Sequence, residues 1–332
     1  MKALVYLGPE QLDIRDVAMP SPSEGDMLVR IDSVGICGSD MHAYLGHDER
    51  RPAPLILGHE AAGHVVSGPQ EGRRVTINPL VTCMTCPACL AGRENLCAHR
   101  QIISMPPREG AFAEYVAMPE RNLVTVPDHV SLQNAALAEP IACGWHAAKL
   151  ADRALGGALS QARILVIGGG AIGVGATLSL KAMDATQIVL VEPNTARRTY
   201  LCEKTGLDAR DPAALDASDS FDLVVDAAGF SATREVASER VAPGGVIVHI
   251  GLGQATGGLN IRRMTLQEIT FIGTYTYSMQ DFRETAQAIF DGRLGLLDWA
   301  VTRPLAAGAE AFAALHSGTA IEPKIILKPH QD

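Results

Sequence analysis

The chain has 332 residues, of which 47% are hydrophobic and 20% charged, so it is long enough for two domains with buried cores and has the composition of a globular protein. Its formal net charge of −9 argues against a nucleic-acid partner, which would need a basic face. Because no secretory signal and no apolar run long enough to cross a membrane stand out, we expect a cytoplasmic protein with no membrane partner.

The first residues with metal-binding chemistry follow a β-rich start. Up to about residue 35 the chain is rich in β-branched residues and broken by prolines, as in short antiparallel strands. Cys37, His59 and Glu60 then offer a thiolate, an imidazole and a carboxylate, which are natural zinc ligands and together cancel the charge of Zn²⁺. Such a set leaves one coordination position open for water or substrate. Taken singly, however, a cysteine is often a small buried apolar residue and a histidine an ordinary loop residue.

A second metal site is predicted in a short cysteine-rich lobe. Four of the seven cysteines lie between residues 83 and 97, namely Cys83, Cys86, Cys89 and Cys97. Four thiolates close a tetrahedral shell, so we expect a structural zinc in a reducing compartment. An iron–sulfur cluster or a redox switch of free thiols is the alternative, because three cysteines separated by two residues each also begin a ferredoxin pattern. That pattern continues with Cys-Pro after three residues, and this sequence does not.

A helix is predicted to begin near Ser131 and to carry Glu139-Pro140 at its end or at a break. The glutamate stands in an apolar stretch, where an ionised carboxylate must find a cation or change its pKa. A metal ion would be a suitable cation. The alternative is a glutamate that faces the surface at a helix end.

The segment from Arg163 to Glu192 predicts a dinucleotide-binding unit. A β-branched apolar run is followed by a G-x-G-x-x-G turn with Gly168, Gly170 and Gly173, then by a helix and a second strand that ends at Glu192. These glycines would allow a tight turn, close approach of a pyrophosphate and close packing of the helix. The acid would bind the adenine ribose and repel a 2'-phosphate, so we expect NAD. A glycine-rich surface loop is the alternative.

Further buried strands are predicted over 221–229 and 244–253, each ending in glycines, where a dinucleotide would lie. A strand over 268–277, a helix over 282–292 and a final strand over 324–327 that returns to the first domain complete the chain. The apolar stretch Ile269–Tyr275 reads as an edge strand. Pairing with its own copy would give a homodimer or homotetramer, whereas a covering element of the same chain is the alternative.

Several motifs in one order resemble the zinc-dependent medium-chain dehydrogenases. They are Cys-Gly-Ser-Asp-x-His at 37–42, Gly-His-Glu-x-x-Gly at 58–63, the cysteine lobe, Glu-Pro at 139–140 and the glycine turn at 168–173. The sorbitol (polyol) dehydrogenase branch is the most similar, with threonine and butanediol dehydrogenases close by. The resemblance covers nearly the whole chain and implies an α/β fold. A GroES-like β-rich catalytic domain over 1–145, completed by 276–332, would enclose an inserted Rossmann domain with a doubly wound parallel sheet over 146–275.

The resemblance also assigns roles to residues. A catalytic zinc would lie on Cys37, His59 and either Glu60 or Glu139, with water where a carboxylate stands back. Ser39 would help to carry the substrate proton, and His42 would extend this relay. By the same matching, the NAD site would be lined by Ile172, Glu192, Arg197, Ile250, Gly251, Leu252, Thr274, Tyr275 and Thr276.

The implied activity is hydride transfer between NAD and the secondary alcohol or ketone of a polyol. A threonine or butanediol type of dehydrogenase is the alternative, and outside this class a silent NAD- or zinc-binding regulator. Ala43 and Thr276 replace a tyrosine and an arginine of animal sorbitol dehydrogenases on the substrate side, so sorbitol itself is not expected. The link from Val65 to Val75 is shorter than in the family, which concerns a surface hairpin.

Overall fold

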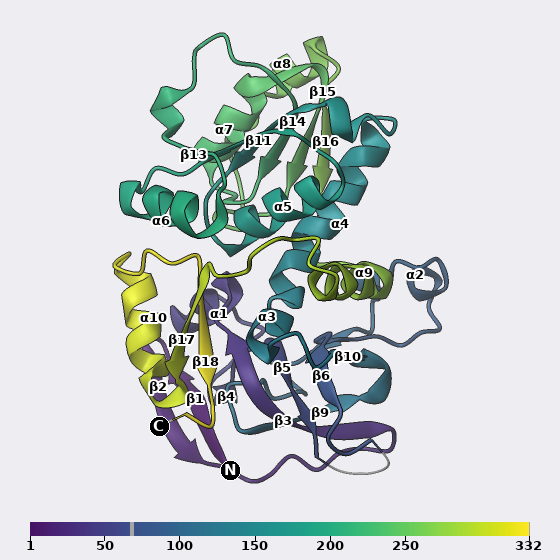
Figure 1. Ribbon diagram of the computed structural model, residues 1–332, viewed down its shortest axis with the longest axis vertical. Coiled ribbons are helices and arrows are strands. Elements are labelled where there is room, and N and C mark those ends of the chain that lie inside the picture. Colours follow the sequence, from purple (N-terminus) through teal and green to yellow (C-terminus); the bar gives the residue numbers. More distant parts are fainter. Residues whose placement is uncertain (67–69, 332) are drawn as a thin grey trace.

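The computed structural model describes residues 1–66 and 70–331. Two lobes are stacked along the long axis, and the long helix α4 (Ala138–Ala154) runs between them (Figure 1). The short link predicted between Val65 and Val75 includes residues 67–69, which lie outside the described part of the chain. Among the described residues, no helix is both long and apolar enough to cross a membrane.

The upper lobe contains a parallel sheet with helices on both faces. Among the described residues the sheet has six strands in the order β13-β12-β11-β14-β15-β16. Successive residues of β11 point to opposite faces, so Ile164 and Val166 join the same core as α4 and α5, while Leu165 and Ile167 join the other. Burial on both faces explains the continuous apolar runs of the sequence. The elements are β11 (Arg163–Ile167), α5 (Ala171–Ala182), β12 (Gln187–Val191), α6 (Thr195–Thr205), β13 (Ala209–Arg210), β14 (Phe221–Asp226), α7 (Ser231–Arg240), β15 (Val241–His249), α8 (Ile261–Leu266) and β16 (Thr270–Gly273).

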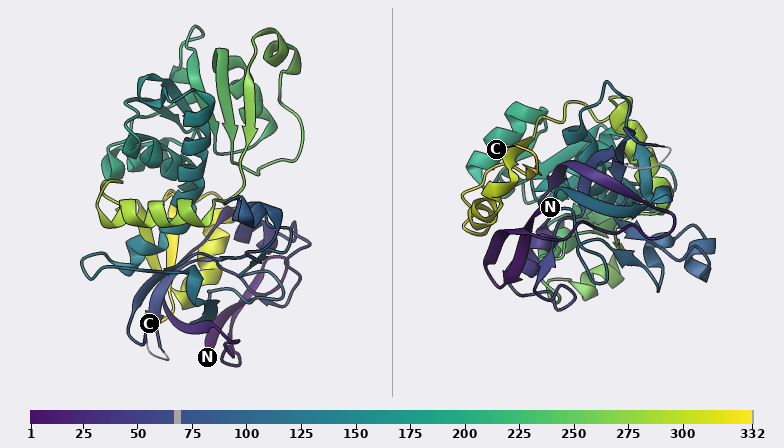
Figure 2. Two further views of the ribbon diagram at one scale, coloured as in Figure 1. Left: turned by 90° about the vertical axis from the view of Figure 1, so that its right-hand side faces the viewer. Right: turned by 90° about the horizontal axis from the view of Figure 1, so that it is seen from below.

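The lower lobe is built from both ends of the chain, as the purple and yellow ribbons show (Figures 1 and 2). Its main sheet has the order β10-β6-β5-β3-β18-β17, and β9 pairs with β3. The C-terminal strand β18 pairs with β3 at Ile326 and Gly35, which confirms the predicted return of the chain. Its elements are β1 (Lys2–Gly8), β2 (Gln11–Asp16), β3 (Asp26–Gly35), α1 (Gly38–Tyr44), β4 (Leu55–Ile56), β5 (Glu60–Val65), β6 (Arg74–Ile77), β7 (Leu80–Val81), α2 (Pro87–Leu90), β8 (Gln101–Ile102), β9 (Tyr115–Pro119), β10 (Leu123–Thr125), β17 (Ala300–Pro304), α10 (Gly308–His316) and β18 (Lys324–Lys328).

The helix predicted to begin near Ser131 is broken into two helices. Of the two places expected for Glu139-Pro140, a helix end or a break, the structure shows a break just before them. Ser131 caps the short helix α3 (Leu132–Ala136) by accepting a hydrogen bond from the Asn134 amide. After Leu137 the helix α4 begins, and Glu139 lies buried in its first turn. A side chain at Gly144 would overlap the backbone of α5, so this glycine lets the two helices pack closely.

One strand and one helix have other bounds than predicted where the chain passes from the upper lobe back to the lower lobe. The strand predicted over 268–277 is confined to β16, because Thr274 to Tyr277 leave the sheet toward the lower lobe. The following helix α9 (Met279–Phe290) begins earlier than predicted because Ser278 and Asp281 form a reciprocal capping box. Strand β16 does lie at the edge of the parallel sheet, as predicted.

Candidate active site

Cys37, His59 and Glu60 meet where α1 begins and β5 starts. Their ligand atoms all lie within 4.8 Å of one another. Asp40, fully buried in the first turn of α1, accepts hydrogen bonds from the Cys37 amide at 3.0 Å and the Gly58 amide at 3.2 Å. It therefore ties the cysteine segment to the histidine segment. A thiolate, an imidazole and a carboxylate at this separation fit a zinc ion.

The charges around His59 favour a cationic site. Burial by itself would lower the pKa of this histidine, but the charges of Asp40 and Cys37 raise it well above its usual value. Asp40 and Cys37 thus create a negative potential at His59. A metal cation could balance it in place of a proton on the imidazole.

Glu60 has a buried partner that the sequence did not reveal. Both carboxylate oxygens lie 2.7 Å from Nζ of Lys324, which also donates to the Ile36 carbonyl at 2.7 Å. A side chain at Gly35 would overlap the Glu60 carboxylate, so this glycine makes room for it. The extra cation means that Cys37, His59 and Glu60 would no longer cancel the charge of Zn²⁺, as expected from the sequence, unless a further carboxylate is ionised.

Glu139 is the carboxylate that can supply this charge. It receives a 2.6 Å hydrogen bond from the hydroxyl of Tyr277, and burial together with the charge of Glu60 raises its pKa to about 7. It lies outside the group of Cys37, His59 and Glu60 whose ligand atoms lie within 4.8 Å. The choice of Glu60 or Glu139 as direct zinc ligand stays a prediction.

One cavity of about 400 Å³ lies between the two lobes and joins the two predicted sets. From the catalytic set it is lined by Cys37, Ser39, His42, His59 and Glu139, while Glu60 is not part of its wall. From the NAD set it is lined by Ile172, Ile250, Gly251, Leu252, Thr274, Tyr275 and Thr276. The volume is in the range of small-molecule sites, about 300–1,000 Å³. The nicotinamide end of a dinucleotide and a substrate could therefore meet beside the metal ligands.

The remaining NAD residues lie around the glycine turn. Gly168 has a φ of 106°, which favours glycine, and a side chain at Gly173 would overlap the Gly168 carbonyl, so the tight turn and close helix packing are confirmed. A Cβ at Gly170 would meet no protein atom within 4 Å, which leaves space for a phosphate at the N-terminus of α5. This geometry fits a dinucleotide. At the other end, the buried hydroxyl of Thr276 has no hydrogen-bond partner among the described residues and is free for a cofactor group.

Glu192 and Arg197 use part of their hydrogen-bonding capacity within the protein. Glu192 accepts from the amides of Gly169 and Asn194, both at 2.9 Å. Arg197 donates to the carbonyls of Ala320 and Ile321 at 2.9 and 3.0 Å, which joins α6 to the chain that leads into β18. Contacts of either side chain with NAD stay predictions.

The cysteine lobe has the geometry of a closed metal site. The ligand sulfurs of Cys83, Cys86, Cys89 and Cys97 all lie within 4.8 Å of one another, with separations of 3.5 Å for Cys83–Cys97 and Cys86–Cys89 and 3.9 Å for Cys83–Cys89. A tetrahedron with zinc–sulfur bonds of about 2.3 Å has edges of about 3.8 Å. A polynuclear iron–sulfur cluster occupies the space between its ligands and would hold them farther apart. The lobe fits a single zinc ion.

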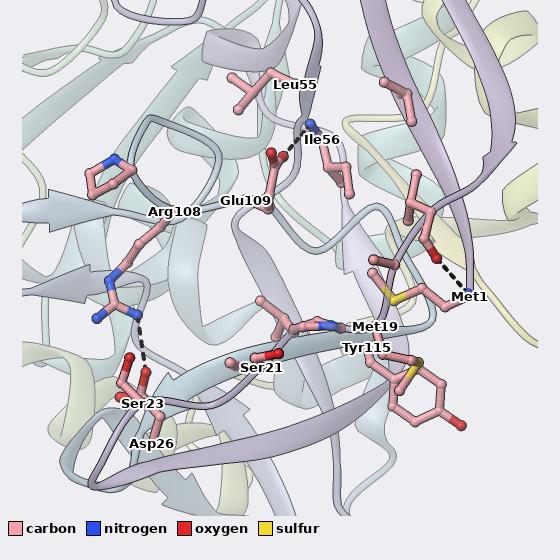
Figure 3. Close-up of a pocket in the computed structure, with 18 of the residues that line it drawn as sticks. Met1, Met19, Ser21, Ser23, Asp26, Leu55, Ile56, Arg108, Glu109 and Tyr115 are labelled. Atoms are coloured by element: carbon pink, nitrogen blue, oxygen red, sulfur yellow. Dashed lines mark hydrogen bonds and ion pairs between the residues drawn. The ribbon is translucent and has the colours of Figure 1, made fainter.

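A larger cavity of about 770 Å³ lies in the lower lobe, away from the metal ligands. Figure 3 shows its walls, where Arg108 pairs with Asp26 and Glu109 accepts from the Ile56 amide. Its lining residues include none of the predicted site residues. The smaller cavity between the lobes is therefore the candidate active site.

Sequence reasoning missed several residues of this site: Lys324, Tyr277, Asp40, Arg50, Arg51 and Cys143. A signal existed for Lys324, since it is a lysine at the start of the apolar final strand predicted to return to the catalytic domain. For Arg50, Arg51 and Cys143 nothing in the local sequence indicated a place beside the metal ligands.

Comparison with known proteins agrees with this geometry. The alcohol dehydrogenase GroES-like domain family matches residues 23–128, and the zinc-binding dehydrogenase family matches residues 171–291. L-galactonate-5-dehydrogenase of Escherichia coli (strain K12) is 31% identical over 89% of this chain and 88% of its own length. Sorbitol dehydrogenase of Bacillus subtilis (strain 168) is 31% identical over 84% of this chain and 83% of its own.

The structure of acetophenone reductase from Geotrichum candidum NBRC 4597, in complex with NAD, superposes with a TM-score of 0.89 at 26% identity and covers 100% of this chain and 98% of that one. The similarity thus extends over both lobes. The chain belongs to the zinc-binding dehydrogenase family with a GroES-like catalytic domain and a Rossmann domain, in its polyol dehydrogenase branch.

Proposed function

We propose that this chain is a zinc-dependent dehydrogenase that transfers a hydride between NAD and the secondary alcohol or ketone of a polyol or sugar alcohol. The observation that carries the proposal is the shared cavity. Cys37 and His59 line the same space as Ile250 and Leu252, which follow a strand of the parallel sheet. A substrate carbon held there would lie between the metal ligands and the nicotinamide end of the cofactor.

The chemistry depends on two bound groups and on the side chains that surround them. When bound, zinc supplies the Lewis acidity that lowers the pKa of the substrate hydroxyl, and NAD accepts the hydride. Cys37, His59 and a carboxylate of Glu60 or Glu139 would hold the metal ion. Ser39 would accept the hydroxyl proton and pass it toward His42, since both line the cavity. Apolar walls at Leu80, Ile102 and Met105 would limit the access of water.

A substrate panel tests the proposal directly. NADH formation would be measured at 340 nm with polyols, sugar acids, simple diols and threonine, using wild-type protein and Cys37→Ser as the metal-site control. We expect the wild-type protein to oxidise polyols and the variant to lose this activity. Turnover of threonine or butanediol alone would favour the alternative branch, and no turnover of any alcohol by zinc-loaded protein would contradict the proposal.

Three further proposals concern the context of the enzyme. The sheets support a catalytic domain over 1–145 and 276–332 and a Rossmann domain over 146–275, since β11 to β16 span residues 163–273. The four-thiolate lobe supports a cytoplasmic location, because a reducing compartment keeps thiolates available for zinc. Edge strand β16 supports a homodimer or homotetramer.

A further inference from the structure

The cavity between the lobes contains an excess of positive charge that the metal site does not explain. The protein carries a formal net charge of −9, yet the arginines and acids that line this cavity are Arg50, Arg51 and Glu139. Glu139 belongs to the predicted metal set. The arginines therefore face the substrate region without a lining carboxylate of their own.

The two arginines share one carboxylate, which lies beside them in the chain. Asp48 accepts from Nε and Nη2 of Arg50 at 2.8 and 3.0 Å and from Nη1 of Arg51 at 2.6 Å. The side chain of Asp48 is only 8% exposed. One negative charge thus stands against two guanidinium groups, and the group of three residues keeps one positive charge.

Arg51 and Arg50 differ in what they can reach. Arg51 has a side chain that is 2% exposed. Its Nε donates to the Ser104 carbonyl at 3.0 Å, and its Nη1, which also donates to Asp48, reaches the Ser39 carbonyl at 3.3 Å. It is a positioning residue for the segments that carry the metal site. Arg50 has a side chain that is 62% exposed, and no described residue accepts a hydrogen bond from its Nη1. Arg50 is therefore the guanidinium that a ligand in the cavity can meet.

A third guanidinium strengthens the positive potential on this wall. Arg100 lies over the ring of Tyr275, with Cζ 4.9 Å from the ring centroid, and Nε lies 3.4 Å from its hydroxyl. Tyr275 lines the cavity. Arg50 lines the same cavity. Arg50 on this wall, together with Arg100 against the ring of Tyr275, would attract an anion.

We propose that this cavity selects a polyol that carries an anionic group at one end, a carboxylate or a phosphate, and that Arg50 is the residue that recognises it. The inference rests on the proposed function and names its substrate class. The secondary hydroxyl would lose its proton to the protein and the carbon that bears it would lose a hydride to NAD, which gives a ketone, while the anionic group remains chemically unchanged. A guanidinium suits this role because its planar donors bind carboxylate and phosphate oxygens in pairs. A neutral polyol would leave these donors to water and to Asp48.

The test compares substrates that differ only at one terminus. Galactitol is paired with galactonate, and sorbitol with gluconate and with sorbitol 6-phosphate. We expect kcat/KM for the anionic substrate of each pair to be about 10- to 100-fold higher than for the neutral polyol. A hydrogen-bonded ion pair in a partly exposed site contributes a free energy of that size. Whichever of gluconate and sorbitol 6-phosphate has the higher kcat/KM shows whether the cavity recognises a carboxylate or a phosphate. The advantage should shrink as salt is raised from low to high concentration.

Variants of Arg50 locate the effect. Arg50→Gln should lose most of the advantage through a higher KM for the anion and change kcat/KM for the neutral polyol less than about 3-fold, while Arg50→Lys should keep part of it. Arg15→Gln is a matched control, because Arg15 is 55% exposed and pairs with Asp13 at 2.9 Å, also two residues earlier. Isothermal titration of gluconate and sorbitol into wild-type and Arg50→Gln protein gives a second readout without turnover.

The outcomes separate the two proposals. Equal or better oxidation of the neutral polyols would overturn the anion inference and leave the dehydrogenase assignment intact. A higher KM for NAD in Arg50→Gln, with unchanged discrimination between polyols, would also overturn it, since Arg50 would then bind the cofactor. No oxidation of any polyol by zinc-loaded protein would refute both.

Discussion

At the scale of single residues, Glu60 and Lys324 form a buried ion pair at the predicted metal site. Both side chains are buried, and removing one partner of such a pair leaves an uncompensated charge that costs about 3–5 kcal/mol. Lys324→Met should therefore lower the free energy of unfolding of the metal-free protein by about this amount. Urea titrations would measure it.

A double-mutant cycle separates the ion pair from simple loss of packing. Glu60→Gln combined with Lys324→Met should cost clearly less than the sum of the single changes, because the double variant buries no unpaired charge. Additive effects would show that the two charges do not stabilise each other.

Cofactor choice is also a property of single residues. Glu192 would repel a 2'-phosphate, which has the same charge. The nearby arginines already bind backbone carbonyls: Arg197 donates to those of Ala320 and Ile321, and Arg198 donates to those of Glu192 and Pro193. We expect kcat/KM for NAD to exceed that for NADP by about 100-fold or more, since a buried like-charge contact costs several kcal/mol. Comparable efficiencies with both cofactors would show that the arginines turn toward the phosphate.

At the scale of elements, the cysteine lobe and the N-cap of α1, where Cys37 lies, should respond differently to loss of a thiolate. We expect about two zinc ions per chain by metal analysis. Cys97→Ser should lose the lobe zinc and destabilise the protein by about 3 kcal/mol or more, because a structural site holds its loop together. Cys37→Ser should lose one zinc and activity while the Tm changes little. Iron in the purified protein, or a folded and fully stable Cys97→Ser, would contradict the assignment.

The contact between α9 and α4 predicts how stability depends on pH. Burial alone would raise the pKa of Asp281, but hydrogen bonds from His146 at 2.8 Å, from Lys149 and from Ser278 hold it below its ordinary value. A lowered carboxyl pKa contributes stability above the unfolded value of about 3.9, and this stability is lost as the pH falls toward the folded value. Unfolding should therefore become easier below about pH 4.

Asp281→Asn tests this assignment. The variant should lose about 2 kcal/mol at pH 7, since hydrogen bonds to a charged group are removed, and its stability should change less on acidification. Asp291→Asn, at an exposed position after the same helix, should change stability by less than about 0.5 kcal/mol. If the stability of both variants depends on pH in the same way, the α9–α4 contact does not control the loss of stability at low pH.

At the scale of the whole molecule, edge strand β16 predicts assembly. Among the described residues β16 pairs with β15 alone, and an edge of this kind can extend the sheet across a twofold axis. Light scattering during size exclusion should give two or four times the chain mass of 35.1 kDa. Thr270→Lys, a charge at an exposed edge position, should weaken assembly, whereas Gln187→Lys on the interior strand β12 should not. A mass of one chain for the wild-type protein would refute the dimer.

Much of the fold was predictable because its signals are local. The glycine turn, its flanking strands and the return of the last strand were anticipated, and the family resemblance supplied the two-domain plan. Less predictable were the extent of β16 and the start of α9. There the apolar pattern of 268–277 continues past the point where Thr274 turns away from the sheet, and a capping box rather than the apolar pattern sets the helix start.

The sequence by itself determined the features whose partners lie close in the chain. The φ of Gly168, the helix start after Gly170 and the four-thiolate lobe depend on neighbouring residues, because a short loop can close over a phosphate or a metal ion in few ways. Only the tertiary structure decided which distant side chains surround the predicted metal ligands. Lys324 reaches Glu60 across 264 residues, and Tyr277 reaches Glu139 across 138, because β18 returns to β3 and α9 packs on α4. Such partners are set by how the elements pack, which a pattern of apolar and polar residues does not specify for single side chains.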